Sequence, residues 1–189
     1  LILLNTTDFH FIVAFSIVLV LIITIMCYLF PVKNVKLSEE HIKALNKSSF
    51  DSFIEKIALF IAFMAFLMGL SYSSVLAFLS SYVKVIDLVQ VSSLFFVVYA
   101  LVITFTRPLS GKIFDNLGEK FVMYPSYLFL SAGLILLSMT TSSWLLLISG
   151  GVIGLGYGTF MSNGQAVSLK TVKDEHRISV ALSTYFIGL

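Results

Sequence analysis

Six long apolar segments, separated by shorter polar stretches, leave this chain few ways to fold. They cover approximately residues 9–30, 54–79, 88–106, 121–138, 144–169 and 178–189. About 20 mostly apolar residues are enough for a helix to cross a bilayer, and the first five segments are about that long. The apolar residues run continuously instead of alternating, which predicts helices and not the strands of a barrel. The sequence therefore predicts an all-α integral membrane protein.

The amino-acid composition supports a lipid environment for these segments. Only 12% of the 189 residues are charged and 58% are hydrophobic, whereas about 25% of a soluble domain is charged. The net charge of +2 is too small to predict a nucleic-acid partner. A single cysteine, Cys27, supports neither a disulfide framework nor a cysteine-based metal site. We therefore expect the bilayer to be a partner, and we expect no metal or cofactor.

The distribution of Lys and Arg predicts the orientation of the segments. All but one of the 12 basic residues lie in or beside the odd-numbered connections, and the exception is Lys84. Because basic residues gather on the cytoplasmic side, the connections at 31–53, 107–120 and 170–177 are predicted to be cytoplasmic. The connections near Lys84 and Ser142 are then external. The long first connection contains LSEEHIKAL, which fits either an amphipathic surface helix or a solvated linker.

The connection RPLSGKIFDNLGEK, residues 107–120, carries a pattern of glycines and charges. Its glycines permit positive φ and close backbone approach, so few residues can join two helices. The pattern resembles the signature loop of the major facilitator superfamily, roughly G-x-L-x-D-R-x-G-R-K. Four positions agree with the signature and two depart from it. The agreeing residues are Gly111, Asp115, Gly118 and Lys120, and the departures are Asn116 and Glu119.

Two further stretches resemble the drug:proton antiporters of that family. FFVVYALVITFTRP is similar to an aromatic-rich helix that ends in Arg-Pro, and GGVIGLGYGTFMSNGQAV is similar to a glycine-rich tenth helix. The family has twelve helices in two six-helix halves, with the signature loop between helices two and three and between eight and nine. A long cytoplasmic linker follows helix six. The resemblance implies helix six at residues 1–30, the linker at 31–53, and helices seven to eleven, the last truncated, at 54–189. The chain would then be a C-terminal half whose N-terminal half is missing.

The resemblance also gives the connection 107–120 a role as a conformational latch. In the family this loop pins the two halves together at the cytoplasmic face of the outward-open state. Asp115, expected near a helix N-terminus, would interact with exposed N–H groups and the positive end of the helix dipole. The alternative is a tight turn with solubilising charges. The expected latch residues are Arg107, Gly111, Asp115, Gly118 and Lys120.

A row of small residues recurs every four positions in the fifth segment. It consists of Gly150, Gly154, Gly158 and Ser162. Such a ridge on one helix face lets membrane helices pack closely. The contacts could slide during alternating access or serve static packing, and the sequence favours neither.

We expect no charged side chain in the interior of any segment, because the acids and histidines lie in connections or at segment ends. Charged groups at membrane depth are costly and usually functional. Their absence predicts no catalytic site, and it places any proton-carrying carboxylate in the missing N-terminal half. The remaining candidates for a substrate cavity are neutral: Tyr72, Tyr99, Asn163 and Gln165. Hydrogen bonding between helices is the alternative role for these groups.

The function implied by the resemblance is proton-coupled efflux of small, amphipathic or drug-like compounds by alternating access. The expected location is the cell (plasma) membrane, with a small-molecule substrate and protons as further partners. One alternative is uptake or export of a small polar metabolite. A second is a non-transporting receptor or assembly subunit on the same scaffold, because a fold does not fix a function. An enzyme is not expected.

Overall fold

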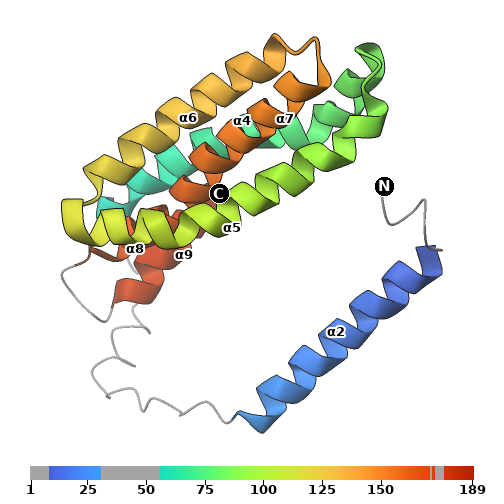
Figure 1. The fold of residues 1–189 in the computed structure, drawn as a ribbon. Coiled ribbons are helices and arrows are strands. Elements are labelled where there is room, and N and C mark those ends of the chain that lie inside the picture. Colours follow the sequence, from blue (N-terminus) through green and yellow to red (C-terminus); the bar gives the residue numbers. More distant parts are fainter. Residues whose placement is uncertain (1–8, 31–55, 171, 173–176) are drawn as a thin grey trace. The chain divides into compact units, whose positions relative to one another are not determined.

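The computed structural model describes residues 9–30, 56–170, 172 and 177–189. It divides the chain into two compact units, residues 1–47 and 48–189. Every regular element in the described ranges is a helix (Figure 1), so the all-α fold class is confirmed. The linker predicted at 31–53, with its surface helix, lies outside the described residues.

The first unit contributes one described helix, α2 (Phe9–Leu29). It carries no Asp, Glu, Lys or Arg, and its apolar part runs over Val13–Leu29. The Thr24 hydroxyl donates to the carbonyl of Val20 at 2.9 Å. This bond satisfies the hydroxyl within its own helix, as apolar surroundings require.

The second unit is a bundle built on four helical segments that are long and apolar enough to cross a membrane. Three are α4 (Lys56–Val85), α5 (Ser92–Leu117) and α6 (Lys120–Ser138). The fourth is a composite helix of α7 (Ser143–Ile153), η3 (Gly154–Gly158) and α8 (Thr159–Lys170). A single 3₁₀ turn, η2 (Val89–Val91), precedes α5, and a shorter helix, α9 (Ile178–Gly188), ends the chain.

The composite helix α7–η3–α8 packs against α5, α6 and α9. Its middle part, η3, has π-helical hydrogen bonding over the sequence GLGYG. A π-helix bonds residue i to i+5 and usually occurs as one turn within an α-helix. The helix therefore continues through the glycine-rich stretch, with one wider turn.

Helices α4 and α9 pack closely through small residues, and a Cβ built on Gly188 of α9 would meet the backbone carbonyl of Ala62 in α4. Ala58, Ala62 and Ala65 of α4 are buried. A Cβ built on Gly69 would lie 2.9 Å from the carbonyl oxygen of Leu189. Small side chains permit such approach between membrane helices, where dispersion contacts and not the hydrophobic effect hold helices together.

The boundary between α5 and α6 differs from the prediction. We expected the third segment to end at Thr106 and a loop to follow, but α5 continues to Leu117. Pro108 lies inside this helix, which membrane helices tolerate better than soluble ones. Only Gly118 and Glu119 separate the two helices. Most of the predicted polar turn is therefore the last three turns of a membrane-length helix.

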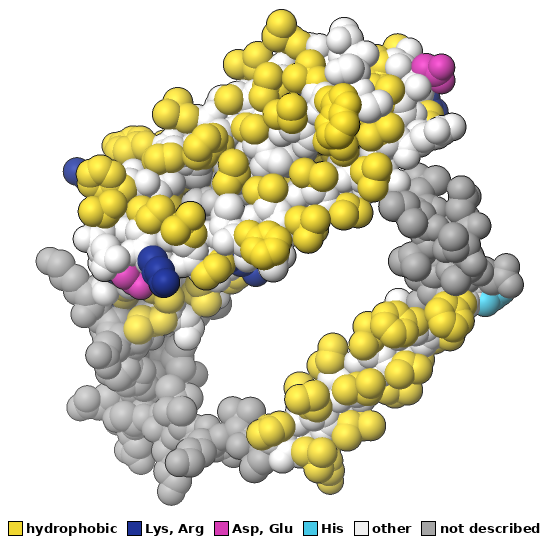
Figure 2. Space-filling model, viewed as in Figure 1, with side chains coloured by type: hydrophobic (Ala, Val, Ile, Leu, Met, Phe, Trp, Pro, Cys, Tyr) yellow, Lys and Arg dark blue, Asp and Glu magenta, His cyan; other side chains and the backbone are white. Residues whose placement is uncertain are grey.

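The surface of the bundle is apolar. Figure 2 shows hydrophobic side chains over most of the visible face, with charged groups toward its ends. Large side chains are among the exposed ones: Trp144 is 77% and Phe105 74% exposed. Such a surface is suited to lipid, since soluble monomers rarely expose large contiguous apolar patches.

Candidate functional site

Three tyrosines from three different helices stack on one another inside the bundle. The Tyr72 ring of α4 lies 5.3 Å from the Tyr99 ring of α5, with an interplanar angle of 12°. It lies 4.2 Å from the Tyr157 ring of η3, at 18°. All three stand well inside their spans. We call Tyr72, Tyr99 and Tyr157 the tyrosine stack; it places aromatic faces and three hydroxyl groups at membrane depth.

The glycine ridge explains how the stack is assembled. A Cβ built on each ridge glycine would lie about 3 Å or less from α5 atoms, so only glycine allows this separation of the two helices. The contacted residues of α5 are also four apart, as expected when i±4 ridges of both helices interdigitate. The fourth ridge residue, Ser162, donates to the Gly158 carbonyl at 3.0 Å. The pairs are Gly150 with Phe95, Gly154 with Tyr99, and Gly158 with Ile103.

Asn163 lies in α8 and serves a contact between helices. Its side chain is buried, and its amide donates to the Ser110 hydroxyl of α5 at 3.1 Å. A second bond, at 2.9 Å, goes to the Thr159 carbonyl in its own helix. The structure thus satisfies this amide within the bundle, which favours the alternative role given above. Gln165 is half-buried, two turns beyond Tyr157.

Arg107 contradicts the expectation that no span contains a charge. Because α5 runs from Ser92 to Leu117, Arg107 lies ten residues, or about 15 Å, before the end of its helix. Its side chain is exposed on the bundle. No residue in the described part of the chain forms an ion pair or a hydrogen bond with its guanidinium. The apolar segment was expected to end at residue 106, so Arg107 was assigned to the connection that follows it.

Arg107 belongs to a stripe of small and polar residues along α5. The stripe residues are spaced by three or four positions, which places them on one helix face. They differ from the neighbouring lipid-type face, where large apolar residues such as Leu101 and Phe105 are exposed. We call this face the polar stripe. Its residues are Ala100, Thr104, Arg107, Gly111 and Asp115.

Asp115 lies in the last turn of α5, not near a helix N-terminus as expected. Its carboxylate is exposed and close to the negative end of the dipole of its own helix, which disfavours an anion. Next to it in the chain, the buried ring of Phe114 receives the ammonium of Lys170 at 4.2 Å from its centroid. The helix ends of α5 and α8 are thus joined by a cation–π contact.

The remaining residues of the expected latch differ in their local constraints. Gly118 has φ of +93°, a conformation that only glycine adopts easily. A Cβ built on Gly111 meets nothing within 4 Å, so packing inside the bundle does not require a glycine there. Lys120 is exposed at the first position of α6.

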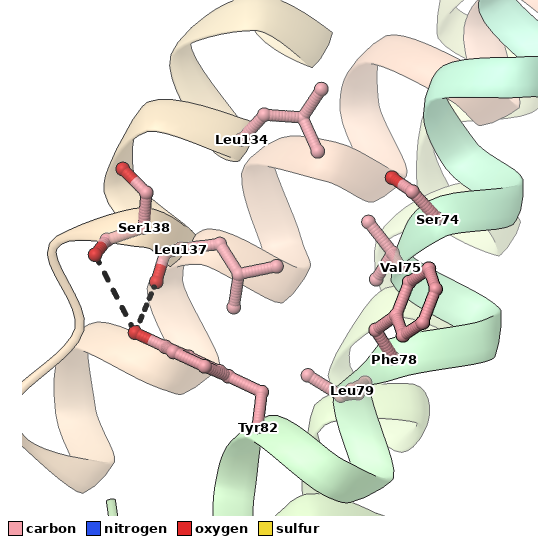
Figure 3. Close-up of a pocket in the computed structure, with 8 residues that line it drawn as sticks. All are labelled: Ser74, Val75, Phe78, Leu79, Tyr82, Leu134, Leu137 and Ser138. Atoms are coloured by element: carbon pink, nitrogen blue, oxygen red, sulfur yellow. Dashed lines mark hydrogen bonds between the residues drawn. The ribbon is translucent and has the colours of Figure 1, made fainter. Parts of the chain in front are cut away.

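One cavity with polar edges lies between α4 and α6, away from the tyrosine stack. It has a volume of about 230 Å³ and is lined mainly by apolar side chains such as Val75 and Leu134. At its rim the Tyr82 hydroxyl donates to the carbonyl of Leu137 at 3.1 Å, with the Ser138 carbonyl at 3.5 Å (Figure 3). Tyr82 therefore caps the C-terminal end of α6 from α4. No sequence motif indicated this contact.

Among residues 9–30, 56–170, 172 and 177–189, no group of three or more His, Cys, Asp or Glu side chains could hold a metal ion.

Two features of the site were not predicted. Tyr157 was overlooked because it stands among glycines, although its place in the middle of a span was visible. The depth of Arg107 was not predicted either. Ser110 and Phe114 lie beyond Arg107 at helical spacing and are buried like Phe95, so the spacing of these residues could have indicated that the helix continues past Arg107.

The comparison with protein families gives one match. The model of the Major Facilitator Superfamily matches residues 1–188. No curated protein and no solved structure matches the chain.

Proposed function

The chain belongs to the Major Facilitator Superfamily of membrane transporters, and we propose that it takes part in proton-coupled efflux of small amphipathic compounds by alternating access. The observation that carries this proposal is the tyrosine stack. Aromatic faces bind apolar and aromatic groups with little requirement for exact shape, and hydroxyl groups beside them can bind polar atoms. Three helices that contribute to one such cluster suit a permissive binding surface.

We also propose that the chain is the C-terminal half of the transporter, with α2 as helix six and α4 to α9 as helices seven to eleven. Helix α6 follows the signature residues directly, as helix nine would. The exposed Asp115 and Lys120 then form part of a latch that holds the two halves together at the cytoplasmic face. The carboxylate of Asp115 has no ion pair within the described residues, so it is free to bind a group on the other half.

Proton coupling in this proposal depends on a carboxylate elsewhere in the full protein. Among the described residues, Asp87 and Glu119 lie in connections between helices, and Asp115 lies in the last turn of α5. A carboxylate that titrates during transport must alternate between access to the two sides of the membrane. The neutral interior of this bundle offers no such group among its described residues.

The proposed sidedness can be tested separately from transport. In a full-length Cys27→Ser protein, a single cysteine at position 115 should be protected from an impermeant thiol reagent in intact cells, and one at 84 should be labelled. The reverse pattern would overturn the orientation and the assigned helix numbers.

The transport proposal can be tested in everted membrane vesicles that contain the full-length protein. Acidifying the vesicle interior should drive accumulation of the amphipathic probe N-phenyl-1-naphthylamine, and a protonophore should abolish it. Vesicles without the protein provide the control. Accumulation that depends on the protein but persists after the pH gradient has collapsed would refute proton coupling. The absence of any protein-dependent accumulation would refute efflux of such compounds.

A second candidate function, export or uptake of a small polar metabolite, is favoured by Arg107. A guanidinium inside a span is costly in a purely apolar pathway. Under this alternative the charged group of the metabolite, and not an aromatic ring, would provide most of the binding energy.

A further inference from the structure

We propose that Arg107 binds a carboxylate of the transported compound while the tyrosine stack holds its apolar part. This inference rests on the proposed function, since it names the chemical class of substrate at the same site. It assigns to Arg107 a role in substrate binding instead of a role in the latch.

The depth of Arg107 in the membrane supports this role. Helix α5 has 26 residues and is about 39 Å long, whereas the hydrocarbon core is about 30 Å thick. Even if the whole excess of about 9 Å extended beyond Leu117, the Cα of Arg107 would lie about 6 Å inside the hydrocarbon boundary. An equal division of the excess places it about 10 Å inside. A tilted helix has less excess length, so tilt deepens this position.

An arginine at this depth needs an anion or a water-filled space. The bundle supplies no anion to it, because the described residues include no ion-pair partner for its guanidinium. Its position on the polar stripe, beside Thr104 and not on the lipid-type face, fits an aqueous cavity. Pro108 adds to this polarity, because it lacks the N–H that would bond the carbonyl of Thr104.

The stack lies in the direction in which the Arg107 side chain extends. Tyr99 precedes Arg107 by eight residues, about 12 Å along the same helix, and long side chains in helices point back toward the N-terminus. A ring joined directly to a carboxylate can therefore contact both.

Guanidinium chemistry makes a carboxylate the fitting ligand. Arginine stays protonated and presents parallel N–H donors that match the two oxygens of a carboxylate. Where such an aqueous space borders protein and lipid, the effective dielectric constant is lower than in bulk water, so this pair is stronger there than in bulk solution. A neutral amide of the same shape can accept only one of these bonds and carries no charge. The site should therefore distinguish an aryl carboxylate from its amide.

Equilibrium dialysis of the purified full-length protein in a neutral maltoside detergent tests this distinction. The probes are 2-naphthoate and its neutral isostere 2-naphthamide at pH 7.5. The wild-type protein should bind the acid at least about tenfold more tightly than the amide, as a charged hydrogen bond allows. Arg107→Gln should remove the preference for the acid without weakening the binding of the amide. Arg107→Lys should retain part of the preference. Lys112→Gln, which removes a charge from another exposed position of α5, should leave both affinities unchanged.

A separate variant tests the contact between the ligand's ring and the tyrosine stack. Tyr72→Leu should weaken the binding of the acid and of the amide by the same factor, because it removes a stacking face and no charge. Circular dichroism of each variant before dialysis shows that loss of binding is not loss of folding.

Several results would overturn the proposal. One is equal binding of acid and amide by the wild-type protein, or no measurable binding of the acid up to millimolar concentration. A second is a preference for the acid that survives Arg107→Gln, as expected if this arginine only contacts lipid phosphate. A third is an equal loss of affinity for the acid and for the amide in Arg107→Gln, as expected if Arg107 only pairs with an acidic residue of the other half. Accumulation of N-phenyl-1-naphthylamine in vesicles tests the proposed function independently of all three.

Discussion

Helix α5 and the composite helix α7–η3–α8 lie side by side, yet their environments differ. Only 11% of the apolar window of the span containing α5 is buried, against 50% for the composite helix. The less buried helix is the more apolar of the two. In a soluble protein the order would be reversed, because apolar residues there are driven inward. Here the difference shows that residue size, and not apolarity, decides which helix occupies the interior.

The reason is that lipid tails are as apolar as a protein core, so large apolar side chains gain little from burial. What the interior offers is close packing, and small residues allow it. The composite helix meets α5 through the glycine ridge, α6 through Gly156, and α9 through Gly164. In helix α5, Leu101 and Phe105 are exposed on the lipid-type face, and the polar groups lie on the polar stripe.

The largest effect should come from a matched pair of glycine substitutions, one in each helix. A Cβ built on Gly156 would lie 2.8 Å from the Leu130 Cα and from the Ser126 carbonyl oxygen, and backbone atoms cannot move aside as a side chain can. We expect Gly156→Val to reduce the free energy of unfolding by about 3 kcal/mol or more. Gly111→Val, where nothing lies within 4 Å, should change it by less than about 0.5 kcal/mol.

Thermal unfolding of the purified full-length variants in detergent, followed by circular dichroism, measures this pair. Equal destabilisation by the two substitutions would break the comparison, because it would mean that α5 is packed as tightly as the composite helix. It would also identify a surface of the rest of the protein that covers Gly111.

The next largest effect concerns the one glycine that α5 needs for its conformation. Gly118 has φ of +93° and ψ of 173°, a region that is nearly restricted to glycine. Gly118→Ala should therefore cost about 1–3 kcal/mol of stability through backbone strain, without a steric clash, since no atom lies within 4 Å of its built Cβ. A melting temperature equal to that of the wild type would show that the connection relaxes freely.

A smaller effect is expected where the two helices share hydrogen bonds. Asn163→Ala removes the bonds to Ser110 and to Thr159, and such bonds contribute about 0.6 to 1.7 kcal/mol in membrane proteins. Gln165→Ala, in the same helix but only half-buried, should have less effect on the melting temperature. If Gln165→Ala is the more destabilising of the two, Asn163 is not the polar contact that joins α5 to α8.

A small gain in stability should follow Asp115→Asn, at the exposed end of α5. Removing a negative charge near the negative end of the helix dipole should stabilise the isolated bundle slightly, by at most about 1 kcal/mol. Turnover should nevertheless fall, because the proposed latch to the other half would be weakened and the ratio of states would shift by about two- to thirty-fold. Transport rate and melting temperature should thus change in opposite directions. A parallel loss of both would mean that Asp115 serves folding.

The spans were predictable from the sequence where apolar runs end at clear polar signals. Helix α6 and the composite helix begin and end within one residue of the predicted segments. The end of α5 was wrong because Arg107 and Pro108 were taken as helix-ending residues, although a proline does not end a helix whose neighbours support it. As a result, Arg107, Lys112 and Asp115 were assigned to a connection, although all three lie in α5.

The candidate site was less accessible to prediction because it depends on how the helices are rotated about their axes. Tyr72 and Tyr99 were candidates for a cavity, but only the bundle brings their rings together and adds Tyr157. The position of a tyrosine within an apolar segment predicts that it lies at membrane depth, but not which neighbouring helix it faces. The neighbour depends on small residues such as Gly154, whose contact with Tyr99 sets the separation of the helices.

The π-helical segment η3 has a consequence for how this chain tolerates insertion and deletion. In an α-helix each four-residue step drifts about 40° around the axis, and a wider π-turn drifts the other way. Gly150, Gly154 and Gly158 can therefore keep facing one neighbour. A π-turn accommodates one extra residue within an α-helix, so deleting one residue within Gly154–Gly158 would restore a plain α-helix and leave the residues after it facing nearly the same neighbours. The same deletion in α7, which has no wider turn to accommodate it, would rotate the following residues by about 100°. Asn163 would then turn away from Ser110, and Gly164 from Tyr185, so the two helical parts differ in their tolerance of a one-residue deletion.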